Sequence, residues 1–160
     1  MEKPITSKRP ESPASVLDAL AATLVESKSS LEIQDWSSLE IDSSTPLTEC
    51  TTVRWRIKES IAGGDATNGI YAIFFEESCL YIGKGKPIWK RVYAHYRESQ
   101  GDDPNPRWVE FFSKYKCEWR VHWLEYDHVG DPVLSDQLRR LFEHVLQNKY
   151  APLFERERRG

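Results

Sequence analysis

Hydrophobic positions cluster or alternate in three short stretches that predict strands. Residues 69–75 (GIYAIFF) are rich in β-branched and aromatic residues, and an apolar stretch at 79–83 follows after the turn residues 76–78. Two such runs around a tight turn predict a β-hairpin. In residues 118–126 apolar and polar side chains alternate, which predicts a third strand with one buried face. Residues 52–62 fit either a strand or a helix.

The remaining apolar positions repeat with helical spacing. Pro87 can begin a helix that runs to about residue 98, and residues 101–106 (GDDPNP) separate it from a second helix at about 107–115. Residues 133–149 predict a final helix, whose apolar stripe consists of Leu134, Leu138, Leu141, Phe142 and Val145. The order hairpin, helix, helix, strand, helix predicts an α+β fold, with a small three-stranded, mostly antiparallel sheet flanked by helices.

The first part of the chain differs in composition. Residues 1–13 contain three prolines and mixed charge and predict a disordered leader. Residues 14–27 have the apolar spacing of a short helix, which would pack on the domain, bind a partner or a second copy, or stay unfolded. The Ser- and Thr-rich residues 28–49 predict a linker. We therefore expect an N-terminal arm over 1–50 and a folded domain over 51–160.

Composition limits the classes of function. Of the 160 residues, 39% are hydrophobic and 29% are charged, and no apolar run reaches the ~18 residues of a membrane span. Three cysteines cannot all pair with one another, which favours a reducing, cytoplasmic location. The net charge of -3 excludes a uniformly basic nucleic-acid binder. Residues 84–97 contain no acid but several cations, so an acidic partner is expected to bind there.

Two tripeptides in the predicted hairpin give the most specific signal. GIY at 69–71 and YIG at 81–83 lie on its two strands, so their tyrosines are expected to be neighbours. On the next helix Arg91 and His95 are one turn apart, at the edge of the apolar face. This pattern resembles the signature of the GIY-YIG nuclease family, in which an Arg and a His on that helix follow the two tripeptides.

The resemblance covers roughly residues 67–155. Glu143 matches the family's metal-binding Glu, and Pro152 begins its Pro-x-aromatic-Asn element, except that Glu155 stands where Asn is usual. The resemblance implies a DNA endonuclease that uses Mg²⁺, or another divalent metal such as Mn²⁺, held by Glu143. The catalytic residues that it implies are Tyr71, Tyr81, Arg91, His95 and Glu143.

Each implied role is consistent with the chemistry of phosphodiester hydrolysis, which requires a deprotonated water and stabilisation of charge on the phosphoryl oxygens. Arg91 would bind the phosphate, and Tyr71 would act as general base or position the water in a network with Tyr81. His95 would relay a proton or contact a phosphate. The cations expected to contact DNA are Lys84, Lys86, Lys90 and Arg97.

Two other interpretations stay open at the level of sequence. Glu155 in place of Asn, together with the acidic net charge, favours a catalytically degenerate domain that binds nucleic acid or a protein. A chance resemblance instead predicts that Tyr71, Tyr81, Arg91 and Glu143 do not converge in space. The N-terminal arm offers a route to a homodimer or a protein partner, and no membrane contact is expected.

Overall fold

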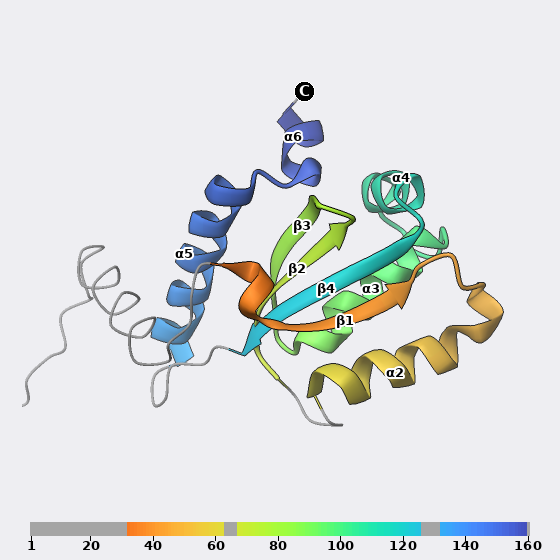
Figure 1. Ribbon diagram of the computed structural model, residues 1–160, viewed down its shortest axis with the longest axis horizontal. Coiled ribbons are helices and arrows are strands. Elements are labelled where there is room, and N and C mark those ends of the chain that lie inside the picture. The colour runs from red at the N-terminus through yellow and green to blue at the C-terminus, as the bar shows by residue number, and fades with distance from the viewer. Residues whose placement is uncertain (1–31, 63–66, 126–131, 160) are drawn as a thin grey trace, which may run out of the picture.

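The computed structural model is an α+β fold built on one four-stranded antiparallel sheet (Figure 1). It describes residues 32–62, 67–125 and 132–159. The predicted helix at 14–27 lies outside these residues. Within them the strand order is β1-β4-β2-β3. The strands are β1 (Ser37–Asp42), β2 (Gly69–Phe75), β3 (Ser78–Gly85) and β4 (Glu118–Glu125).

The hairpin of β2 and β3 is the part of the sheet that positions the tripeptides. Its register pairs Tyr71 with Gly83 and Ile73 with Tyr81, so the two tyrosines are diagonal neighbours on one face. β2 also pairs with β4 on its other side. As an interior strand with both faces covered, β2 is apolar and buried at nearly every position, which explains its unbroken hydrophobic run.

The fourth strand, β1, lies in the segment predicted to be a linker. Its sequence, SSLEID, pairs with β4 and sets Leu39 against Val121 and Ile41 against Trp119. Only these two positions face the core, so a short and mostly polar edge strand resembles a loop in sequence. The three-strand prediction is therefore corrected to four strands, and the folded part of the chain extends N-terminal to the predicted boundary at residue 50.

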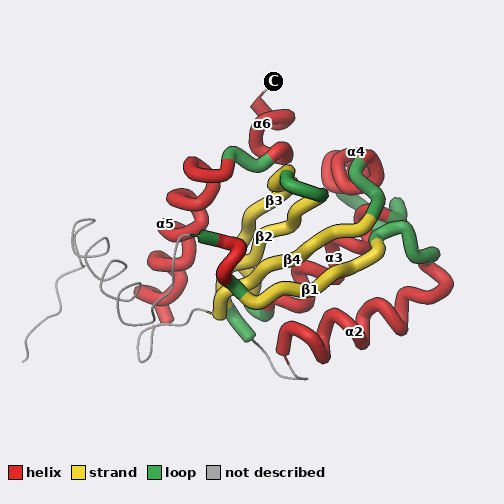
Figure 2. Tube along the Cα trace, viewed as in Figure 1, coloured by secondary structure: helices red, strands yellow, loops and turns green. Residues whose placement is uncertain are grey.

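Helices cover both faces of the sheet (Figure 2). One face packs against α2, α3, α4 and α6, and the other packs against α5 together with a short 3₁₀ turn, η1 (Ile33–Asp35). The helices are α2 (Cys50–Ala62), α3 (Ile88–Ser99), α4 (Pro106–Lys114), α5 (Pro132–Tyr150) and α6 (Leu153–Arg159), and a second 3₁₀ turn, η2, spans Leu47–Glu49. None of the described helices is long and apolar enough to cross a membrane.

The element at 52–62, left open by the sequence, is the helix α2. Ile57 and Ile61 are one turn apart and both are buried against the sheet, whereas Trp55 is 65% exposed. A strand would have placed Trp55 and Ile57 on the same face, so their opposite burial follows from the helical period. α2 packs against α3, which brings two basic helices together at one side of the molecule (Figure 1).

Candidate active site

The two motif tyrosines meet on the α3 face of the hairpin. Tyr71 is completely buried, Tyr81 is partly exposed, and their ring centroids are 5.9 Å apart. Gly83 makes this approach possible, because a Cβ at that position would lie 2.6 Å from Cε1 of Tyr81 and 2.9 Å from the Tyr71 hydroxyl. Any side chain at residue 83 would therefore separate the two phenols. This close approach gives a physical reason for glycine at the end of the second tripeptide.

Helix α3 brings Arg91 and His95 to the tyrosines. The Tyr71 hydroxyl lies 2.7 Å from Nε2 of the buried His95, which is hydrogen-bond distance. The positive charge of Arg91 opposes the upward pKa shifts of Tyr71 and Tyr81, and its guanidinium lies 5.9 Å from the centre of the Trp108 ring. The structure thus brings four of the five sequence-predicted catalytic residues together on one face of the sheet.

Glu98 extends this group and was not predicted from the sequence. Its Oε2 lies 2.7 Å from Nδ1 of His95, and the residue is only 3% exposed. The sequence does contain one signal for this contact. His95 and Glu98 are three residues apart, and residues at that spacing on a helix share a face. The sequence does not show that Glu98 is buried, because helix α4 packs over α3 only in the folded protein. The Glu98 backbone carbonyl accepts a hydrogen bond from Ser113 on α4.

Burial sets the protonation of this group. It raises the pKa of Tyr71 well above its usual value and that of Tyr81 to about 12, while the charge of Arg91 acts in the opposite direction on both phenols. Burial lowers the pKa of His95 well below its usual value and raises the pKa of Glu98 to about 8. His95 is therefore neutral at physiological pH, and its tautomer depends on whether Glu98 holds a proton.

An aromatic shell excludes water from these polar groups. His95 stacks on Phe112 at a centroid distance of 4.5 Å, and Phe154 of α6 contacts both Trp108, at 4.6 Å, and Tyr81, at 5.4 Å. Phe112 belongs to the buried cluster on this face of the sheet, and Trp108 packs against it. The shell explains why the desolvation effects on Tyr71 and His95 are large.

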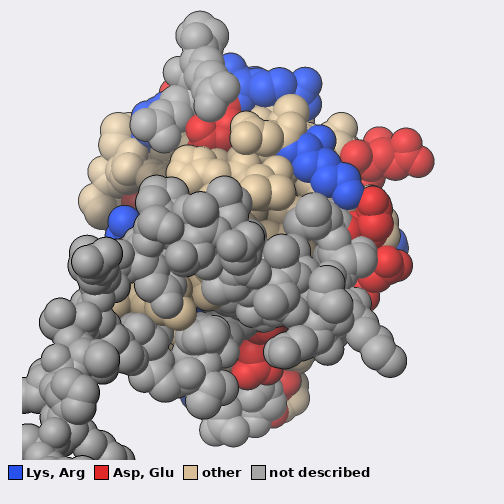
Figure 3. All heavy atoms as spheres, turned by 90° about the vertical axis from the view of Figure 1, so that its left-hand side faces the viewer, with Lys and Arg blue, Asp and Glu red and all other residues tan. Residues whose placement is uncertain are grey.

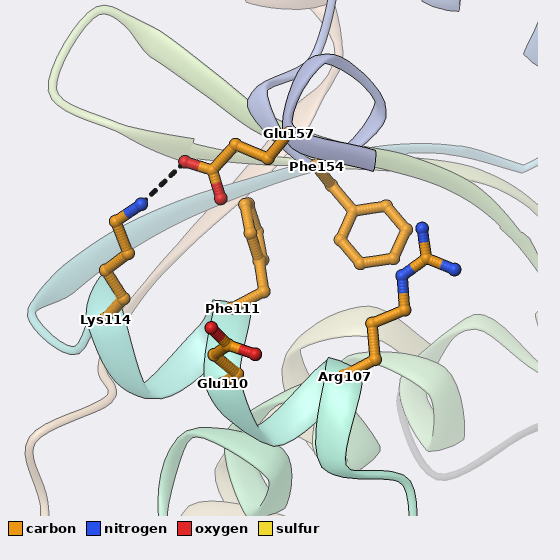
Figure 4. Close-up of a pocket in the computed structure, with 6 residues that line it drawn as sticks. All are labelled: Arg107, Glu110, Phe111, Lys114, Phe154 and Glu157. Atoms are coloured by element: carbon orange, nitrogen blue, oxygen red, sulfur yellow. Dashed lines mark hydrogen bonds and ion pairs between the residues drawn. The ribbon is translucent and has the colours of Figure 1, made fainter. Parts of the chain in front are cut away.

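A small pocket between α4 and α6 lies behind this shell rather than at the candidate site. Figure 4 shows Phe111 and Phe154 between the two helices, with the Arg107 guanidinium over the Phe154 ring at 5.6 Å. At its rim Lys114 donates a hydrogen bond to Glu157 at 2.8 Å. These contacts dock α6 on α4, and they hold Phe154 against Tyr81.

Glu143 lies at the open edge of the sheet, beside β3. The neighbouring side chain of Gln147 donates hydrogen bonds to the Ile82 carbonyl of this edge strand, at 3.2 Å, and to Oε1 of Glu143, at 3.1 Å. The negative charge of Glu143 contributes to the raised pKa of Tyr81, so the carboxylate acts on the tyrosine pair across the strand edge. Glu143 thus acts on Tyr81 through its charge, whereas the other four predicted catalytic residues lie together on the α3 face.

A second carboxylate shares the cavity beside Glu143. The lining includes Glu143, Glu155 and Arg156, and Lys and Arg side chains are visible at the end of the molecule that carries α6 (Figure 3). Burial raises the pKa of Glu143, and the charge of Glu155 raises it further, against the opposing charge of Lys84. Two carboxylates whose repulsion a cation would relieve fit a Mg²⁺ ion that keeps most of its waters. In the described part of the chain no three potential ligand side chains gather for a fully protein-bound metal.

The four cations expected to contact DNA fall into two kinds. Lys84 is 3.0 Å from Oδ1 of Asp136, and Arg97 is 2.6 Å from Oδ2 of Asp102, so each is already ion-paired. Lys86 and Lys90 are exposed and form no ion pair with the described acidic residues. The structure therefore separates two paired cations from two that are available to an anion.

Comparisons with known proteins leave the geometry as the main evidence. No family model matches the chain, and neither the curated proteins nor the solved structures contain a significant match.

Proposed function

We propose that the chain is a metal-dependent endonuclease of the GIY-YIG type that hydrolyses DNA phosphodiester bonds. The observation that supports this most strongly is the cluster of Tyr71, Tyr81, Arg91 and His95, in which the Tyr71 hydroxyl contacts His95 and the charge of Arg91 acts on both phenols. A chance resemblance gives no reason for these residues from β2, β3 and α3 to meet. The three cysteines are free thiols, which supports the proposed cytoplasmic location.

Arg91 supplies fixed positive charge to the reaction. It is partly buried beside two phenols, and no acidic side chain in the described residues forms an ion pair with it. A guanidinium in this state can bind a phosphate through two parallel hydrogen bonds without first breaking a salt bridge. In the reaction it would stabilise the charge on the phosphoryl oxygens.

The buried residues supply a route for the proton of the attacking water. Tyr81, the more exposed phenol, has its ring centre 5.9 Å from that of Tyr71, whose hydroxyl contacts His95. Once Glu98 is ionised, above its pKa of about 8, Tyr71 can pass its proton to Nε2 of His95 while Nδ1 passes its own to the Glu98 carboxylate, so that a phenolate forms with no change in net charge. That phenolate can accept a proton from water through Tyr81.

Glu143 is the residue that would hold the divalent metal, with Glu155 as its neighbour in the cavity. A bound Mg²⁺ or Mn²⁺ would supply charge stabilisation to the leaving oxygen. The chain's own contribution is a carboxylate fixed by Gln147 at the strand edge, within electrostatic reach of Tyr81.

Cleavage of DNA by the purified protein tests the proposal. Supercoiled plasmid, branched DNA and single-stranded DNA would be incubated with Mg²⁺ and with EDTA, using the native chain, Tyr71→Phe and Glu143→Gln. Controls are Tyr150→Phe, whose hydroxyl accepts a hydrogen bond from the Ile33 backbone N–H, and Glu40→Gln, whose carboxylate pairs with Arg120. Metal-dependent cutting that is lost in the first two variants and kept in the controls is the expected result.

The alternative function is a degenerate domain that binds nucleic acid or a protein without cutting. Glu155, where the resemblance expects Asn, is the feature that favours it. Folded protein that binds DNA but cuts none of its forms, with or without metal, would support this alternative and would exclude the nuclease.

A further inference from the structure

Three cations surround one buried indole on the side of α3 that faces α2. The Arg54 guanidinium is 5.1 Å from the centre of the Trp89 ring, the Lys58 ammonium is 5.3 Å from it and the Lys90 ammonium is 5.7 Å from it. Trp89 itself is only 6% exposed. Attraction to the ring's π-face holds the three cations near one another. We refer to Arg54, Lys58 and Lys90 around Trp89 as the α2–α3 surface.

No acidic side chain in the part of the chain that the structure describes pairs with this surface. Arg54, Lys58 and Lys90 form no ion pair with any acid among the described residues, although other exposed cations do, including Arg120 with Glu40. Three like charges held together without counter-charges repel one another, and a polyanion relieves that repulsion. The local charge of the surface is therefore complementary to a phosphate backbone, despite the acidic net charge of the chain.

The surface begins next to the candidate active site. At about 100° per residue, Lys90 lies between Arg91, which faces the tyrosines, and Trp89, which faces α2. Lys90 thus occupies the exposed ridge of α3 that separates the two. A helix with its side chains is about 10–12 Å across. At a rise of about 3.4 Å per nucleotide, a strand would cover this distance in roughly three nucleotides.

We propose that the α2–α3 surface binds the DNA phosphate backbone a few nucleotides from the bond that is cut. This inference rests on the proposed function, because it takes Arg91 as the position of the scissile phosphate. It assigns Arg54 and Lys58, in a helix that the sequence left undefined, to substrate binding. An acidic protein would match the charge equally well, but only a continuous backbone connects this surface with Arg91.

Binding measured without cleavage tests the inference. Fluorescein-labelled duplex DNA would be titrated in EDTA with the full chain and with the double variant Arg54→Gln/Lys58→Gln, over a series of salt concentrations. Losing two phosphate contacts should make the negative slope of log K against log salt less steep by roughly 1.8, about 0.9 for each contact. The single variant Lys90→Gln should have about half this effect, and serves if the double variant does not fold.

The matched control is Arg120→Gln/Lys149→Gln, which removes the same charge from two ion-paired cations outside the surface. An equal loss of slope in the control, or no loss in the α2–α3 variants, would overturn the inference. Binding of polyglutamate that depends on Arg54 and Lys58 while DNA binding does not would also overturn it. A reduced slope in a protein that cuts no DNA would support the surface and reject the nuclease.

Discussion

The two halves of the candidate site differ in how completely their polar groups are paired. On the α3 face, Tyr71, His95 and Glu98 form a buried chain in which two contacts of 2.7 Å satisfy both nitrogens of the imidazole. At the edge of β3, Glu143 and Glu155 share an open cavity, and each adds negative charge to the other's surroundings.

This contrast separates proton transfer from ion binding. A buried, fully paired chain keeps a fixed geometry and needs only a change in proton position, since its partners are already aligned. Two partly exposed carboxylates keep free lone pairs for a cation that carries its own waters. Because the two halves would do different chemistry, variants of each half should fail in different ways.

Arg91→Ala should have the largest effect, because the charge of Arg91 acts on both phenols and would stabilise the phosphate. We expect the single-turnover rate of cleavage to fall by about 10³-fold, in the range for removing a donor to developing charge. The control is Arg120→Ala, which removes an exposed arginine of β4. Full activity of a folded Arg91→Ala protein would remove Arg91 from the mechanism.

Glu143→Gln should remove the response to metal while leaving the buried chain intact. We expect cleavage to fall by about 10²-fold at a Mg²⁺ concentration that saturates the native protein, in line with loss of a charge that stabilises the transition state. The rate would be measured across a Mg²⁺ series. An unchanged metal dependence would place the ion elsewhere, and Glu155 would then be the first residue to test.

Glu98→Gln should disrupt the buried chain on the α3 face. The variant should differ from the native protein in the pH dependence of both its stability and its cleavage rate. Burial raises the pKa of Glu98 from 4.5 to about 8 in the folded protein. Between these values the unfolded chain has lost a proton that the folded chain keeps, so the free energy of unfolding decreases as pH rises. The opposite contribution of His95, whose pKa is lowered by burial, fades as pH rises past 6.5. From pH 6.5 to 8 the native protein should therefore lose about 1 kcal/mol.

Urea unfolding at pH 6.5 and 8 measures this loss, which the Gln variant should not show. In the same variant the cleavage rate should fall by about tenfold and no longer increase as pH passes 8, because Gln cannot accept the proton from His95. A variant with native pH dependence in both measurements would show that Glu98 serves packing alone.

The sequence predicted the paired half of the site less completely than the fold around it. The hairpin and α3 follow from apolar periodicity and turn residues, and the tripeptides identify Tyr71 and Tyr81. The α+β fold class is confirmed. Glu98 could not be found in this way, because a Glu next to solvated helix positions becomes buried only when α4 packs on α3. β1 was missed for the related reason that its pairing with β4 joins segments far apart in the chain.

Pairing of charges is similarly invisible in the sequence. Lys84, Lys90 and Arg97 look equivalent in one basic stretch, yet Asp136 and Asp102 pair with two of them, and no described acid pairs with Lys90. Which of these three cations is ion-paired depends on where α5 places Asp136 and where the loop after α3 places Asp102. The structure is therefore needed to tell which cations of a basic stretch can bind an anion.

The smallest effect is expected from Glu155→Asn, which restores the residue that the resemblance expects. The charge of Glu155 raises the pKa of Glu143, so a neutral amide should lower it and keep Glu143 ionised to lower pH. At saturating Mg²⁺ the acidic limb of the plot of cleavage rate against pH should shift to lower pH by less than about one unit. One partly screened charge has an effect of this size. The Mg²⁺ concentration for half-maximal rate should rise only a few-fold, because Glu143 still holds the ion. A shift of the acidic limb to higher pH instead would show that Glu155 itself binds the metal, so that both carboxylates at the strand edge hold the ion.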